Sequence, residues 1–340
     1  MKNILIIFQL LICNLIYSQT NKIYTDLEVA LKSPNEVYRI SLEKQNLKRI
    51  PKEIFEFPNL ISLDLSHNEL NEIPNEIIQI KNLKALTLNF NHFDTIPNSV
   101  LDLEELEFIN FKNNKIRYIQ GELLKNKNLK QLDVSHNKIQ QLPNFEHNPT
   151  IEVLNLEWNS IEAIPSSIQN LSNLKTLYLA FNKLVFLPEE IGNLKNIKEI
   201  FAFNNQLETL PNSIGNLEQL NHLVLSSNKI KSIPNSIINL VELKEFDVSG
   251  NSLENLPTNI NKLKNLRRLI LSNNKLIQFP EGLETILTLH TLILNDNLIQ
   301  EIPNEILNSQ SLKTIFLRNN PIPEKEIQKL KEVLSNTKIY

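Results

Sequence analysis

Apolar and polar positions along the chain repeat every 23 residues from Val37 nearly to the C-terminus. The clearest copy, Leu220 to Leu243, reads LNHLVLSSNKIKSIPNSIINLVEL. Its apolar residues stand at positions one, four, six, eleven, fourteen, eighteen and twenty-one, with Asn at position nine. Alternation at positions four to six predicts a short strand whose apolar side chains point inward. Pro at position fifteen prevents the strand from resuming there, so we expect an irregular, polyproline or 3-10 return limb.

Thirteen copies follow one another, and every step is 23 residues except the 22 between Leu129 and Ile151. They begin at Val37, Leu60, Leu83, Leu106, Leu129, Ile151, Leu174, Ile197, Leu220, Leu243, Leu266, Leu289 and Leu312. One copy cannot close a core, so stability must come from stacking neighbours. Because strands stack about 4.8 Å apart and the return limb is bulkier, we expect a concave parallel sheet. Stacked Asn side chains at position nine should pair the buried turns.

Two adjacent copies depart from the pattern. Gln120-Gly121 replaces the Pro position in the fourth copy, and the fifth ends QLPNFEHNPT, one residue short. We expect a local irregularity on the convex side between Gln120 and Thr150, as a hinge or as a packed variant in which Phe145 fills the gap.

The two ends of the chain differ from the repeats. Residues 1–18 combine Lys2 with an apolar run from Ile4 to Ile16 and predict a signal peptide cleaved after Ser18. The alternative is an anchor helix that stays attached. The sole cysteine, Cys13, lies in this run, so no internal disulfide can form.

Helical caps are predicted beside the repeats, which occupy residues 37–320. Residues 19–36 should form an N-terminal cap with a helix over 25–32 and Thr25 as its N-cap. Residues 321–340 should form a C-terminal cap with a helix over 324–334, followed by a short tail. Each cap would cover an otherwise open end of the stack.

Composition and motifs exclude most chemistry. A net charge of −3 is too small for an electrostatic nucleic-acid binder. The six His residues have no metal-ligand spacing, and no P-loop, G-x-S-x-G or H-E-x-x-H motif occurs. We therefore expect no enzymatic activity, no metal and no cofactor.

The variable positions carry the functional information. Position five points out of the predicted sheet; it is polar in the first six repeats and apolar in six of the last seven. Exposed apolar and aromatic surface marks interaction sites, which predicts a contact patch. Its residues are Trp158, Tyr178, Phe181, Phe201, Phe203 and Val224. The alternative is that aromatics suit strands and that Trp158 and Phe181 pack against neighbouring turns. A broken basic column at position two is interpreted as a solvated edge with salt bridges.

The unit N-x-L-x-x-I/L-P-x-x-I-x-x-L resembles the 23-residue leucine-rich repeat of bacterial secreted proteins and is similar to that of Ras-group intracellular scaffolds. The flanks DLEVALKSPNEVYRISL and NPIPEKEIQKLKEVL resemble the caps of the bacterial proteins. The resemblance implies an α/β solenoid: a leucine-rich repeat horseshoe with a concave parallel β-sheet, an irregular or 3-10 convex side and helical caps at both ends.

The resemblance also implies a non-enzymatic recognition module. We expect a protein exported from a bacterial cell, secreted, periplasmic or on the cell surface, that binds another protein or a glycan on its concave face. It should be a monomer that binds no nucleic acid and has no membrane span after signal cleavage. The alternatives are an intracellular Ras-group-like signalling scaffold, a structural surface layer or adhesin, and an enzyme, which the missing catalytic motifs disfavour.

Overall fold

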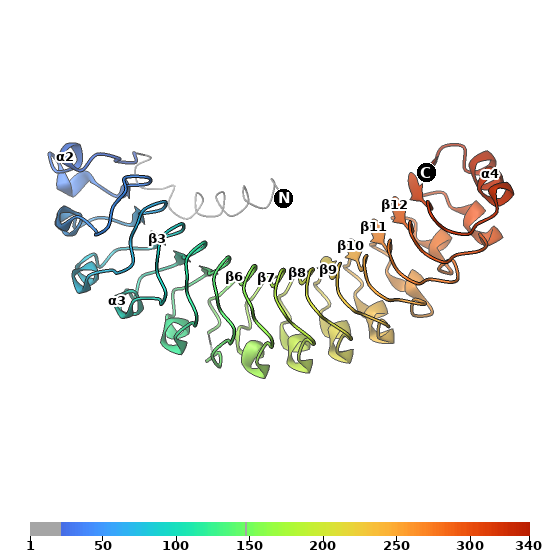
Figure 1. Cartoon of the computed structure of the whole chain (residues 1–340), viewed down its shortest axis with the longest axis horizontal. Helices are drawn as coiled ribbons and strands as arrows, with labels where there is room; N and C mark the ends of the chain where they lie inside the picture. The colour runs from blue at the N-terminus through green and yellow to red at the C-terminus, as the bar shows by residue number, and fades with distance from the viewer. Residues whose placement is uncertain (1–21, 147) are drawn as a thin grey trace. The chain divides into compact units, whose positions relative to one another are not determined.

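A computed structural model describes residues 22–146 and 148–340. The predicted signal peptide, residues 1–18, and the first three residues of the predicted N-terminal cap lie outside the described residues. The chain divides into two compact units, one ending at Asn159 and one beginning at Ser160, and each is described by itself (Figure 1).

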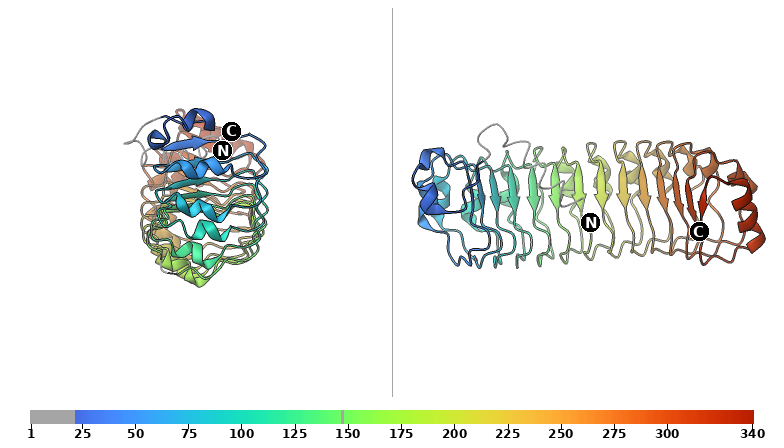
Figure 2. Two further views of the ribbon diagram at one scale, coloured as in Figure 1. Left: turned by 90° about the vertical axis from the view of Figure 1, so that its left-hand side faces the viewer. Right: turned by 90° about the horizontal axis from the view of Figure 1, so that it is seen from above.

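Short parallel strands pair in chain order within each unit (Figure 2). The first unit contains β1 (Arg39–Ser41), β2 (Ser62–Asp64), β3 (Ala85–Thr87), β4 (Phe108–Asn110), β5 (Gln131–Asp133) and β6 (Val153–Asn155). The second contains β7 (Thr176–Tyr178), β8 (Glu199–Phe201), β9 (His222–Val224), β10 (Glu245–Asp247), β11 (Arg268–Ile270), β12 (Thr291–Ile293), β13 (Thr314–Phe316) and β14 (Lys338–Ile339). The predicted parallel sheet is confirmed in both.

The strand register follows the sequence period. Leu63 of β2 lies opposite Leu86 of β3, 23 residues on. Between β5 and β6, where the repeat is one residue short, Leu132 lies opposite Leu154. The short repeat therefore loses its residue from the return limb, and the strands keep their alignment.

The return limbs are mostly 3-10 turns, as predicted. They are η2 (Lys52–Glu56), η3 (Asn75–Gln79), η4 (Gly121–Lys125), η5 (Ser166–Asn170), η6 (Glu189–Asn193), η7 (Asn212–Asn216), η8 (Asn235–Asn239), η9 (Ile260–Lys262), η10 (Leu283–Thr285) and η11 (Asn304–Asn308), with one α-helical turn, α3 (Asn98–Leu101). Pro188 precedes η6 in an extended conformation, and its fixed φ sets the entry to the turn. Ile191 then points inward and is fully buried.

The Asn at position nine forms the predicted ladder. Asn205 accepts a hydrogen bond from Leu184 N at 3.0 Å and donates to Leu179 O at 2.9 Å, both in the preceding repeat. It also donates to Ala202 O of its own turn at 3.1 Å. The same arrangement recurs at Asn68, Asn91, Asn114, Asn137, Asn159, Asn228, Asn251, Asn274, Asn297 and Asn320. Each Asn thus uses donor and acceptor to join two coils.

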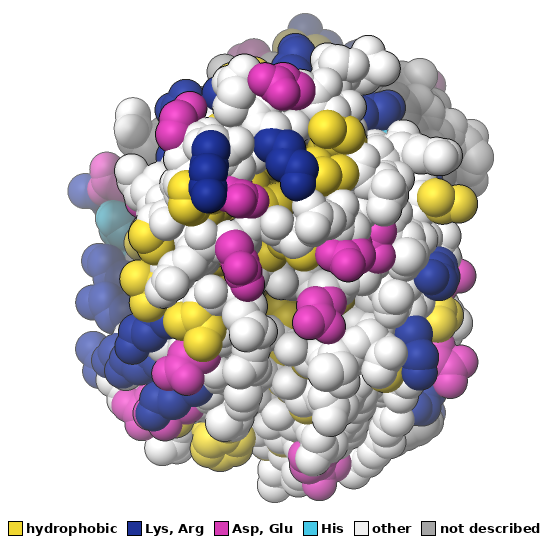
Figure 3. All heavy atoms as spheres, turned by 90° about the vertical axis from the view of Figure 1, so that its right-hand side faces the viewer, with side chains coloured by type: hydrophobic (Ala, Val, Ile, Leu, Met, Phe, Trp, Pro, Cys, Tyr) yellow, Lys and Arg dark blue, Asp and Glu magenta, His cyan; other side chains and the backbone are white. Residues whose placement is uncertain are grey.

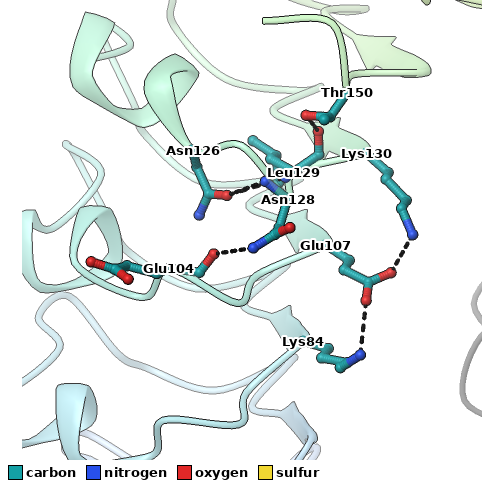
Figure 4. A network of polar contacts seen from close by, with 8 residues as sticks. All are labelled: Lys84, Glu104, Glu107, Asn126, Asn128, Leu129, Lys130 and Thr150. Atoms are coloured by element: carbon teal, nitrogen blue, oxygen red, sulfur yellow. Dashed lines mark hydrogen bonds and ion pairs between the residues drawn. The ribbon is translucent and has the colours of Figure 1, made fainter.

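A second Asn column, absent from the sequence prediction, joins the coils at position twenty-three. Asn82 donates to Pro58 O at 3.1 Å. Asn128 donates to Glu104 O at 3.0 Å (Figure 4). In the second unit, Asn265 donates to Val241 O at 2.9 Å. These bonds pair carbonyl groups at the end of the return limb, opposite the first ladder in the coil.

The irregular fifth repeat is a packed variant. Its described residues form no helical turn between β5 and β6. Phe145 is buried, as predicted, and Asn148 donates to Leu124 O and Asn126 O at 2.6 and 2.9 Å. Thr150 donates to Leu129 O at 2.9 Å. An apolar side chain and side-chain hydrogen bonds therefore replace the missing turn.

The helix of the N-terminal cap is shorter than predicted. This helix, α2, spans Leu27–Ala30, followed by η1 (Pro34–Glu36). The N-cap is Asp26, which accepts from Val29 N at 3.2 Å, so the prediction of Thr25 as N-cap is wrong. A carboxylate at this position accepts the hydrogen bond and also interacts favourably with the partial positive charge at the N-terminus of the helix. Tyr24 pairs with Ile40 and extends the edge of the sheet.

The C-terminal cap combines the predicted helix with an unpredicted strand. Helix α4 spans Glu324–Val333 and buries Leu330 completely. The short tail predicted after it contains a strand, because β14 pairs with β13 and places Ile339 opposite Ile315. Charged and hydrophobic side chains are interspersed on this end of the second unit (Figure 3).

Candidate functional site

A stripe of apolar side chains runs across the strand face of the second unit. We call it the apolar stripe; it occupies position five and consists of Tyr178, Phe201, Val224, Ile270, Ile293 and Phe316, interrupted by Asp247. Tyr178 lies opposite Phe201, and Phe201 opposite Val224. The Tyr178 and Phe201 rings stack with centroids 5.1 Å apart and planes 7° apart. Three of the predicted patch residues therefore lie side by side.

The members of the stripe differ in exposure. Tyr178 is only 6% exposed, whereas Phe201 and Val224 are half-buried. Strand alternation sends Leu177 and Ile200 to the opposite side, where both are fully buried in the core. Phe201 and Val224 consequently offer the accessible apolar surface of this part of the stripe.

Phe181 and Phe203 stand beside the stripe at the end of the strands. Their rings meet edge to face with centroids 5.3 Å apart. Phe181 has φ of +56°, in the left-handed region, at position eight, where other repeats carry Asn204, Gly250 or Asn273. A bulky side chain in this conformation costs about 1–2 kcal/mol. The scaffold therefore retains Phe181 although Asn or Gly would suit its backbone better.

Trp158 belongs to the first unit and the other five predicted residues to the second. It is 46% exposed, has φ of +53° and stacks on His136 with ring centroids 5.1 Å apart. The ring therefore packs on a neighbouring turn and still faces solvent, while its place in a contact patch stays a prediction.

A second stacked pair at position eight was missed. His67 and Phe90 stack with centroids 4.1 Å apart and planes 12° apart. The signal was available, since two flat rings at the same position of consecutive repeats must lie about one strand spacing apart.

The strand face of the first unit is polar, and its side chains bond to their own turns. Asp133 accepts from Ser135 N at 2.8 Å, and Asn155 accepts from Glu157 N at 3.1 Å. In the second unit, Asp247 is the only position-five residue whose side chain can accept a hydrogen bond from the main-chain N–H of its own turn. The N–H groups of Phe203 and Ser226, both at position seven, have no hydrogen-bond partner in the described chain. The second unit therefore has main-chain N–H groups without hydrogen-bond acceptors beside its apolar stripe.

In the first unit, salt bridges form along the position-two edge, as predicted for that part of the basic column. Glu107 lies between Lys84 and Lys130, with N···O distances of 3.1 and 2.7 Å (Figure 4). Burial raises the pKa of Glu107, but hydrogen bonds from Lys130 and Lys84 outweigh it, and the pKa lies below its ordinary value. The network joins three consecutive coils of the first unit.

Glu157 experiences the opposite effect. Burial, and then the negative charge of Asp133, raise its pKa from 4.5 to about 7, against the opposing charge of Lys112. Because the folded state binds the proton more tightly than the unfolded state, Glu157 stabilises the fold fully below pH 4.5. This contribution is lost as pH rises through about 7.

Glu157→Gln, which mimics the neutral acid, should therefore match the natural protein at pH 5 and exceed it in stability by about 1 kcal/mol at pH 8, after allowance for solvent screening. Urea unfolding at both pH values measures the difference. Exposed Glu105→Gln is the control and should show no such pH-dependent gain. Equal stability of Glu157→Gln and the natural protein at pH 8 would contradict the assignment.

The part of the chain that the structure describes contains neither a metal-binding cluster nor a membrane-spanning helix. No group of three or more His, Cys, Asp or Glu side chains there could hold a metal ion. None of its helices is both long and apolar enough to pass through a bilayer.

Comparison with known proteins gives consistent matches. Family profiles described as leucine-rich repeats match residues 35–93 and 81–139, and also 150–171, 173–194 and 265–286. A sequence search of curated proteins finds no match.

Three solved structures illustrate the similarity. A leucine-rich repeat protein of Leptospira interrogans is 30% identical with a TM-score of 0.70, over 94% of this chain and 100% of that one. An internalin of Listeria monocytogenes is 20% identical with a TM-score of 0.77, over 88% of this chain and 85% of that one, and shows the fold alone. A plant peptide hormone receptor, in complex with RGF2, is 33% identical with a TM-score of 0.74; the match covers 84% of this chain and 48% of the receptor.

Proposed function

This chain belongs to the leucine-rich repeat family, and we propose that it is a non-enzymatic module whose second unit binds another protein. The observation that carries the proposal is the apolar stripe, where Phe201 and Val224 lie side by side on the solvent side of the sheet. Contiguous apolar surface of this kind is typical of interaction sites.

Two further observations support a protein ligand over a glycan. Aromatic side chains are the residues that most often dominate protein interfaces, and Phe181 and Phe203 extend the stripe. The unpaired N–H groups of Phe203 and Ser226 can donate to the carbonyl groups of a polypeptide laid along the stripe. The plant receptor named above was solved in complex with RGF2, which provides a precedent in a similar fold.

Export from a bacterial cell is part of the proposal. Its support is the arrangement of Lys2 and the apolar run in residues 1–18. We expect the intact mass of the native protein to match a chain that begins at Gln19. A native protein that retains Met1 would favour the alternative, an intracellular Ras-group-like signalling scaffold.

Partner capture tests the binding function. The mature chain and its Phe201→Ser variant are immobilised, and bound proteins from the source cells and their surroundings are quantified by mass spectrometry. Loss of a central aromatic anchor should weaken binding of the partner about 30-fold. The matched control is Phe186→Ser, which removes an aromatic ring that is 52% exposed and outside the strand face. Capture that is equal with all three proteins would contradict the proposal.

A further inference from the structure

Charge is distributed unequally between the two sides of the second unit. Positions two to ten of repeats seven to thirteen, which form the strands and the turns after them, contain ten Lys and Arg but four Asp and Glu. The remainder of residues 160–340 contains eight Lys and Arg but fourteen Asp and Glu. The unit as a whole is neutral, so the excess of basic groups beside the strands is balanced by an excess of acidic groups on the return limbs and the C-terminal cap.

The first unit lacks this separation. Positions two to ten of its six repeats hold seven Lys and Arg and seven Asp and Glu. The basic strand side therefore coincides with the half of the chain that carries the apolar stripe. If the basic residues served only solubility, we would expect them on the strand side of both units and not mainly on that of the second.

Most of the basic groups beside the strands of this unit are available to a ligand, with Glu199 and Glu245 at position three lying between them and the stripe. They stand at positions two and three, immediately before or within the strands: Lys175, Lys198, Lys244, Arg267, Arg268 and Lys313. Within residues 160–340, Arg268 forms a salt bridge with Glu245, whereas Lys198, Lys244, Arg267 and Lys313 form none. Lys198, Arg267 and Lys313 are exposed.

From this geometry we infer that the ligand is an acidic polypeptide segment with bulky apolar side chains, lying across the strands along the apolar stripe. This inference rests on the proposed function and specifies its partner. Acidic side chains would face the column of Lys198, Lys244 and Arg267, and apolar side chains would contact Phe201 and Val224. Opposite charge across an interface speeds association and excludes basic partners.

The size of the segment follows from the sheet. Strands β7 to β13 are separated by six gaps of about 4.8 Å, so the stripe is about 29 Å long. An extended chain covers about 3.3 Å per residue, and about nine residues therefore match the stripe. An anionic polysaccharide could satisfy the charges but would leave the apolar side chains uncovered, which favours a polypeptide.

Labelled peptides of about nine residues provide the probe. One combines Glu with spaced Phe, a second replaces Glu by Lys, a third replaces Glu by Gln, and a fourth replaces Phe by Ser. Fluorescence anisotropy with the mature chain should show that the Glu–Phe peptide binds at least about tenfold more tightly than each of the others, and less tightly at high salt.

Charge reversal identifies the column. Lys244→Glu with Arg267→Glu should weaken binding of the Glu–Phe peptide about tenfold or more. The matched control, Lys262→Glu with Lys264→Glu, makes the same change in net charge on the return side of the tenth repeat and should leave binding within about twofold. Circular dichroism checks that both variants fold.

The contrary outcomes separate the two proposals. Equal or tighter binding of the Gln–Phe or Lys–Phe peptide, lost with Phe201→Ser, would overturn the acidic partner and leave protein binding intact. Binding of heparin through Lys244 and Arg267 with no peptide binding would also overturn it. If neither the peptides nor any captured protein bound in a way that depends on Phe201, both the acidic partner and protein binding on the apolar stripe would be overturned.

Discussion

Asn205→Ala should lower the free energy of unfolding by about 3 kcal/mol. The side chain is buried, and its loss leaves Leu184 N without an acceptor inside the stack. It also removes one of two amide donors to Leu179 O, which keeps its bond from Asn182. A buried group that loses its hydrogen bond keeps the full cost of leaving water. Because repeats are stabilised by their neighbours, loss of one rung also weakens the two interfaces next to it.

Urea unfolding followed by circular dichroism measures this effect. The control is Asn255→Ala, because Asn255 is exposed and its side chain has no hydrogen-bond partner in the described chain. This control should change stability by less than about 0.5 kcal/mol. A loss below 1 kcal/mol for Asn205→Ala would mean that the ladder does not hold the coils together.

Gly215→Ala is expected to cost about 2–3 kcal/mol. Gly215 lies in η7, and a Cβ there would overlap the carbonyl oxygen of Ser236 in η8. Since the obstacle is main chain, two return limbs would have to move apart. Gly192 faces Ser213 in the same way, so coils seven to nine pack closely on their return side.

Gly121→Ala provides the comparison by the same unfolding measurement. It also lies in a 3-10 turn, but its Cβ would meet only Pro143 Cβ, at an ordinary 3.9 Å. This variant should be neutral or slightly more stable, because Ala restricts the unfolded chain. Equal effects of the two substitutions would contradict the close approach at Gly215.

The features fixed by the period could be predicted from the sequence. Inward leucines, the Asn ladder and the Pro-marked return follow from repeating needs: a core, paired turns and a limb that is not a strand. The end of the chain could not be predicted in the same way. Lys338 and Ile339 have no pattern of their own, and they become β14 because β13 offers an unpaired edge.

The variable positions were predictable only in part. Their column identified Tyr178, Phe201 and Val224 as neighbours, because a parallel register brings equal positions together. It did not indicate how exposed each would be: Tyr178 is nearly covered, whereas Trp158 stays half open on His136. Exposure depends on the surrounding side chains of several repeats, which no single position encodes.

The most direct test of the account is hydrogen–deuterium exchange of the chain alone and with the partner captured through Phe201. The amides of Phe203 and Ser226, which have no hydrogen-bond partner in the described chain, should exchange quickly when free and slow down in the complex. Segments 199–204 and 222–227 are therefore expected to gain protection, while the return limb at 212–216 stays unchanged. Protection confined to the return limbs or to the first unit would contradict binding on the apolar stripe.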